Sequence, residues 1–118
     1  MGPNLKITIS EGLTDENYQL VKFDGDFDKA GHAEVREQLD KCITDFSLKS
    51  LVFDFTALKF INSEGIGYLM EVHTHLVQRE RQLVIVGLND HVKDVFEAIG
   101  IANIVPIYVN LSEFLSKQ

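Results

Sequence analysis

Hydrophobic and polar residues alternate at the start of the chain, and this pattern predicts a strand. Between residues 5 and 9 the apolar side chains occupy every second position, the period of a strand with one solvent-facing side. A second strand is expected over 18–23, ending at Asp24-Gly25, and the polar stretch 11–17 reads as a turn. We expect these two strands to pair as a hairpin.

Three later segments, 31–46, 63–78 and 89–99, carry apolar residues at intervals of three and four. This spacing is typical of amphipathic helices. Asp28 lies near the start of the first helix, Asn89 is a good N-cap for the third, and Gly100 is a good terminator. A short fourth helix is expected from Asn110, with Glu113 three residues on.

Short apolar runs lie between and after these helices, over 51–55, 83–86 and 104–108. Such runs indicate parallel strands covered by helices. Pro106 cannot donate a ladder hydrogen bond, so the last strand belongs at a sheet edge. The alternation of strands and helices predicts the α/β class: one domain over residues 1–118, with a mostly parallel sheet of about five strands and about four helices.

Composition narrows the functional classes. The 118 residues include 11 Lys and Arg against 18 Asp and Glu, giving a net charge of −7. An acidic chain without a basic run is a poor nucleic-acid binder. No apolar stretch approaches the roughly 18 residues of a membrane span, and no signal peptide is recognisable. A single cysteine, Cys42, lies on the apolar stripe of the first helix and is expected to pack in the core. We therefore expect a soluble, cytoplasmic protein with neither membrane insertion nor a nucleic-acid partner.

The loop after the third predicted strand, residues 56–67, carries the candidate chemistry. It places Ser63 at the mouth of a helix and Gly65 and Gly67 in the following turn. Each glycine costs a helix about 1 kcal/mol relative to alanine, so a backbone or bound group is expected to come close. The alternative is that Asn62 or Ser63 is simply an N-cap and the glycines allow tight helix packing.

The segments 25–28, 54–56, 62–67 and 95–101, taken in this order, resemble the STAS domains of bacterial anti-sigma factor antagonists. That family has a strand ending Asp-Leu-Ser, then Asp-Ser-Ser/Ala-Gly-Leu/Ile-Gly opening a helix. Here 54–56 (Asp-Phe-Thr) and 62–67 (Asn-Ser-Glu-Gly-Ile-Gly) are similar. The stretch 25–28 resembles the family's Gly-Glu-Leu-Asp, and 95–101 resembles its hydrophobic segment ending in Gly-Leu.

The resemblance implies a non-enzymatic, cofactor-free module that switches partners. Ser63 would be the phosphoacceptor. The module would have two partners: an anti-sigma factor that is also a serine kinase, and a separate serine phosphatase. The expected partner-binding residues are Asp26, Asp28, Asn62, Ser63, Glu64, Gly65 and Gly67.

Two residues depart from the family pattern: Asn62 replaces the usual Asp, and Glu64 replaces a small residue. Asn62 still suits a helix cap. Glu64 places a permanent negative charge beside the acceptor, with three open consequences: weaker phosphorylation, a different kinase, or a Ser63 that only binds.

Two other functions fit the same sequence. One is a STAS module of another system, such as a stress-signalling assembly or the soluble subunit of a lipid-transport ABC complex. The other is a small serine hydrolase, because 61–65 resembles Gly-x-Ser-x-Gly; the first glycine is missing, and adjacent Asp90 and His91 would rarely face one serine together. No histidine and carboxylate spacing predicts a metal site, and His73 is expected to be a packing residue.

Overall fold

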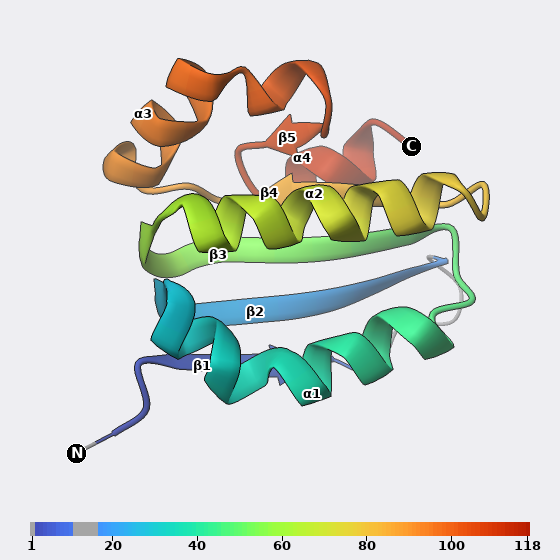
Figure 1. Cartoon of the computed structure of the whole chain (residues 1–118). Helices are drawn as coiled ribbons and strands as arrows, with labels where there is room; N and C mark the ends of the chain where they lie inside the picture. Colours follow the sequence, from blue (N-terminus) through green and yellow to red (C-terminus); the bar gives the residue numbers. More distant parts are fainter. Residues whose placement is uncertain (1, 11–16) are drawn as a thin grey trace.

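The fold, seen in a computed structural model, is described for residues 2–10 and 17–118, so most of the turn expected over 11–17 lies outside the described residues. In chain order the elements are β1 (Leu5–Ile9), β2 (Tyr18–Phe27), α1 (Lys29–Asp45), β3 (Ser50–Ile61), α2 (Ser63–Val77), β4 (Gln82–Val86), α3 (Asp90–Ile99), the 3₁₀ turn η1 (Ile101–Asn103), β5 (Ile107–Tyr108) and α4 (Leu111–Ser116). The strands form one sheet in the order β1-β2-β3-β4-β5 (Figure 1). β1 is antiparallel to β2 and the other pairs are parallel. The predicted hairpin and the mostly parallel α/β sheet are confirmed.

The helices divide between the two faces of the sheet. Side chains of α1, α2 and α3 share one buried cluster with the sheet, whereas α4 packs on a smaller cluster that includes Tyr18, Leu20 and Val52. In the larger cluster, the ring centroids of Phe53, Phe55 and Phe27 lie 4.8, 5.0 and 5.6 Å from that of Phe23. Large buried aromatic rings contribute strongly to core stability, and this cluster fixes α1 and α2 over the sheet.

Two strands are longer than predicted. β2 continues through Asp24-Gly25 to Phe27, and β3 continues through the expected loop to Ile61. Gly25 has φ +122°, and a Cβ there would lie 2.1 Å from the backbone oxygen of Asn4. Any other residue at position 25 would overlap the β1 side of the pair and strain the backbone, so glycine allows β2 to remain paired with β1 here.

Irregular pairing explains why β3 was predicted too short. Between residues 22 and 26, β2 advances by four residues, while its partner β3 advances by six, from 54 to 60. Each extra residue is a bulge that offsets the alternation of sides. The buried positions of β3 consequently fall three apart, at Phe55, Leu58 and Ile61, a spacing that does not resemble a strand.

The last strand and the second helix also correct details of the prediction. The edge position of β5 is confirmed, but the strand begins only after Pro106, whose oxygen accepts a hydrogen bond from the Ile85 backbone at 3.0 Å. The apolar spacing in α2 predicts a buried stripe of Ile66, Leu69, Met70, His73, Leu76 and Val77, but the buried side of the helix is rotated from it. Tyr68 and Val72 are buried, His73 is only half-buried, and Val77 is 52% exposed. Apolar residues cover more of this helix than the sheet can bury.

Candidate functional site

Three helices begin at one end of the sheet, because α1, α2 and α3 follow the carboxyl ends of the parallel strands β2, β3 and β4 (Figure 1). Each has a side-chain cap, and the cap predicted at Asn89 is confirmed. Asp28 accepts from the Gly31 backbone N–H at 2.8 Å, Asn62 from Glu64 at 3.0 Å and Gly65 at 3.4 Å, and Asn89 from Val92 at 2.8 Å. Backbone amides without helical partners gather at this end and favour negative charge.

Ser63 is the first residue of α2 and is exposed. The preceding residue, Asn62, supplies the cap, and its own N–H donates to the Phe27 oxygen at 3.3 Å, which ties the helix start to the end of β2. The fold therefore does not require the Ser63 hydroxyl as a cap, and a modification there leaves the cap in place.

The two glycines of α2 have different surroundings. A Cβ on Gly65 would lie 2.6 Å from the Phe27 oxygen and 2.7 Å from Cγ1 of Ile61. The close backbone approach expected at this position comes from the domain's own β2. Gly65 is therefore buried, and its lack of a side chain lets the start of α2 pack against the end of β2. A Cβ on Gly67 would meet no atom within 4 Å. Gly67 is exposed four residues after Ser63, so both lie on one outer side of the helix.

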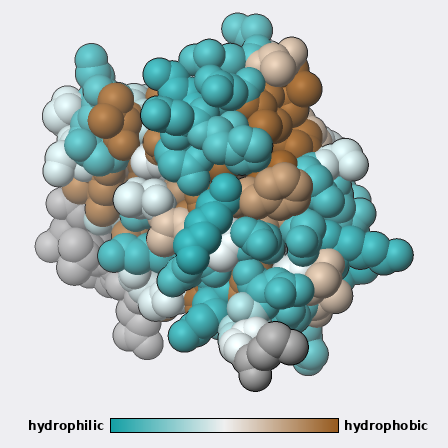
Figure 2. Space-filling model, turned by 90° about the vertical axis from the view of Figure 1, so that its left-hand side faces the viewer, coloured by the Kyte–Doolittle hydropathy of each residue, from teal (hydrophilic) through white to brown (hydrophobic). Residues whose placement is uncertain are grey.

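The acidic residues expected near Ser63 are brought together by strand pairing. Phe27 pairs with Ile61 and Asp26 with Phe60, so the end of β2 lies beside the residues just before Asn62. Asp26 and Asp28 are both half-buried there. Figure 2 looks onto this end of the domain, where hydrophilic surface predominates and hydrophobic patches are interspersed.

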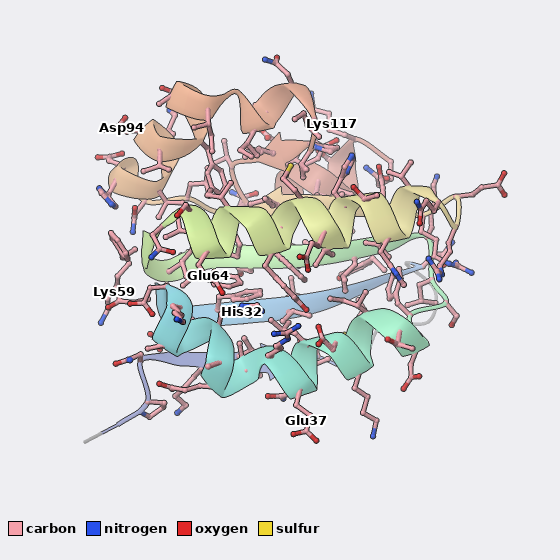
Figure 3. The ribbon with its side chains drawn as sticks, viewed as in Figure 1. His32, Glu37, Lys59, Glu64, Asp94 and Lys117 are labelled. Atoms are coloured by element: carbon pink, nitrogen blue, oxygen red, sulfur yellow. The ribbon has the colours of Figure 1, made fainter. Side chains whose placement is uncertain are left out.

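Two features near Ser63 were missed by sequence reasoning. His32 is buried, and its Nδ1 lies 3.5 Å from Oε1 of Glu64, which extends from α2 toward α1 (Figure 3). A signal was available, because His32 falls at helical spacing from the buried Val35 and Leu39.

The second feature is Phe60, which is 39% exposed and stacks on His91, with ring centroids 5.8 Å apart. No sequence pattern distinguishes such an exposed phenylalanine from a core one.

The other chemical candidates are placed as follows. Within residues 2–10 and 17–118, no group of three or more His, Cys, Asp or Glu side chains could hold a metal ion, and no helix is long and apolar enough to cross a membrane. Cys42 is half-buried and lines a groove of about 550 Å³ between α1 and the start of β2. Burial, with a smaller effect of Asp45, raises the pKa of the Cys42 thiol, so its reactive thiolate form is disfavoured.

Comparison with known proteins agrees with this architecture. The family model described as "STAS domain" matches residues 11–114. The chain belongs to the STAS family. An anti-sigma-B factor antagonist of Listeria monocytogenes is 30% identical over 107 residues, covering 88% of this chain and 89% of the relative.

Solved STAS structures share the fold at lower identity. An anti-sigma factor antagonist from Mycobacterium paratuberculosis superimposes with a TM-score of 0.83 at 18% identity, covering 96% of this chain and 92% of that one. The antagonist SpoIIAA in its unphosphorylated form gives 0.76 at 16% identity, covering 95% of each chain. Its phosphorylated form, from Bacillus, gives 0.69 at 15% identity, covering 95% and 98%. These superpositions extend over nearly the whole domain.

Proposed function

We propose that this STAS domain is an anti-sigma factor antagonist that acts by switching partners in the cytoplasm. Unmodified, it binds an anti-sigma factor through the surface around the start of α2, formed by Asp26, Asp28, Asn62, Ser63, Glu64 and Gly67. The anti-sigma factor is also a serine kinase, and it phosphorylates Ser63. A serine phosphatase restores the binding form. The domain is a binding module and not an enzyme.

The observation that carries this proposal is the position of Ser63 itself. Ser63 is exposed as the first residue of α2, while Asn62 caps the helix. A phosphate brings a charge of roughly −1.5 to −2, which the N-terminal amides of a helix accommodate. The modified domain should therefore stay folded, so what changes is its surface.

Release of the partner follows from desolvation, obstruction and repulsion. A strongly hydrated dianion at the centre of an interface must lose its water, and this cost is large unless it is paired. The phosphate would also lie on the same side of α2 as Gly67, where an added Cβ would meet no atom of the described residues within 4 Å. A kinase that has just transferred phosphate holds a nucleoside diphosphate, whose charge repels the product. Glu64 adds another negative charge on the same turn.

Incubation with the source organism's anti-sigma factor kinase and ATP, followed by peptide mass mapping, tests the site directly. We expect one phosphate on the peptide that contains Ser63, and none in Ser63→Ala. Lys29→Asp is a matched control for Ser63→Asp, because Lys29 is the first residue of α1 as Ser63 is of α2. Only Ser63→Asp should weaken partner binding strongly. Phosphate found solely on another residue would refute the proposal.

A further inference from the structure

His32 connects α1 to the residue that follows the proposed phosphoacceptor. Its side chain is 9% exposed, and Nδ1 faces the Glu64 carboxylate at 3.5 Å. The other ring nitrogen, Nε2, is buried and has no hydrogen-bond partner among the described residues. In Figure 3 the two side chains lie between α1 and α2. Buried polar atoms are normally hydrogen-bonded, so a buried imidazole with one acidic neighbour and one unpaired nitrogen is unusual in a protein core.

The groups around His32 identify Glu64 as its direct charged neighbour. They are Glu64 and Tyr68 from α2, Phe27 from β2, and, four residues to either side of His32, the N-cap Asp28 and Arg36 of α1. The Tyr68 ring lies tilted against the imidazole, with centroids 4.3 Å apart, and its hydroxyl donates a hydrogen bond to Asp40 at 2.6 Å. Burial and the bond to Asp40 raise the pKa of Tyr68, so this neighbour stays neutral. Arg36 pairs with Asp40 at 3.5 Å.

Charge at the start of α2 therefore depends on whether His32 is protonated. A phosphate on Ser63 and the carboxylate of Glu64 would be two anions on consecutive residues. A protonated His32, 3.5 Å from the Glu64 carboxylate, would offset the Glu64 charge. Added negative charge at residue 63 would favour a cation at this position.

We propose that His32 is a positioning residue for the Ser63 site: it holds the Glu64 carboxylate toward α1 and, when protonated, neutralises it so that phosphate on Ser63 is better tolerated. The inference rests on the proposed function, in which Ser63 is phosphorylated. By thermodynamic linkage, phosphate favours the protonated ring by the same factor as protonation favours the phosphorylated state. Histidine changes charge between about pH 5 and 8, so the phosphorylated state becomes relatively more stable as pH falls.

The test uses protein that carries phosphoserine at position 63 by genetic encoding, so it needs no kinase. Ring signals of all four histidines are followed by NMR from pH 5 to 9 in the unmodified and phosphorylated proteins. We expect the titration midpoint of His32 to rise by roughly half a pH unit or more on phosphorylation. His75, in the last turn of α2 and also with a buried Nε2, is the internal control and should not move. A His32 midpoint that is unchanged, or a ring that does not titrate in this range in either protein, would overturn the proposal.

A second measurement covers the reciprocal effect. The change in melting temperature caused by phosphoserine is compared at pH 5.5 and pH 8 in the wild type and in His32→Gln. The phosphate group itself loses its second proton near pH 6 and so makes the melting temperature depend on pH without any histidine. The His32→Gln protein measures this contribution and serves as the baseline. We expect phosphoserine to be better tolerated at pH 5.5 in the wild type than this baseline explains, and Glu64→Gln to reduce the excess. Equal pH dependence in the wild type and His32→Gln would refute the proposal. Failure of a kinase to phosphorylate Ser63 would refute the proposed function and leave these results unaffected.

Discussion

The N-termini of α1 and α2 share one construction, and comparing them separates architecture from function. In each, a polar side chain caps the helix and a glycine three residues later lies against the end of β2. Asp28 caps at Gly31 and Asn62 caps at Gly65. A Cβ on Gly31 would lie 2.0 Å from the oxygen of Asp26, as one on Gly65 would lie 2.6 Å from that of Phe27. The shared cap and glycine therefore fix both helices on the sheet.

The differences lie in the first residue and in the charge of the cap. α1 begins with Lys29 and has the carboxylate of Asp28 as its cap, whereas α2 begins with Ser63 and has the neutral amide of Asn62. A neutral cap leaves the helix N-terminus free to stabilise an added anion. The chemistry that distinguishes the two ends is thus an exposed hydroxyl beside an uncharged cap, and it does not depend on the buried glycines.

The largest effects on stability are expected from the glycines that seat the helices. Gly31→Ala and Gly65→Ala should each lower the free energy of unfolding by roughly 1–3 kcal/mol, because the new methyl group overlaps a backbone oxygen. Gly67→Ala is the matched control in open space and should raise stability by about 0.5–1 kcal/mol. Urea denaturation of the three variants measures these changes. A Gly65→Ala protein as stable as Gly67→Ala would contradict the assigned packing role.

Removal of the caps should have the next largest effect. Asp28→Ala and Asn62→Ala should each cost about 0.5–2 kcal/mol of unfolding free energy, because one helix amide loses its acceptor. Asp28→Asn preserves capping, so it separates stability from binding. Our proposal expects this variant to bind the anti-sigma factor more weakly while melting within a few degrees of the wild type. Unchanged affinity would leave Asp28 as a cap alone.

Exchanging the cap type should produce the smallest effect and the sharpest comparison. Asn62→Asp makes α2 resemble α1 and should stabilise the unmodified domain by about 0.3–1 kcal/mol through the helix dipole. In the protein with phosphoserine at position 63 this gain should vanish or reverse, because the carboxylate then lies beside the phosphate. Thermal melts of both forms at pH 8 check this. The same gain in both forms would show that the neutral cap is unrelated to phosphorylation.

Local signals made the start of α2 predictable, whereas contacts between distant segments did not. Asn62 and Ser63 are found in their expected places because capping depends on residues within one turn. The length of β3 was missed because its two bulges exist only in the pairing with β2. Gly65 was expected to lie near another group, yet only the fold shows that the group is Phe27. The contact between His32 and Glu64 joins residues 32 apart, and their spacing within each helix does not reveal it.

The central claim is that phosphate on Ser63 releases the anti-sigma factor, and calorimetric titration tests it most directly. The source organism's anti-sigma factor is titrated with the unmodified domain and with the domain carrying phosphoserine at position 63, at one pH and one salt concentration. We predict a dissociation constant about 100-fold larger or more for the phosphorylated domain, a difference in binding free energy of roughly 2.7 kcal/mol. Ser63→Ala should bind like the unmodified protein. Equal dissociation constants for the two forms would contradict the account, even if Ser63 proved to be the phosphorylated residue.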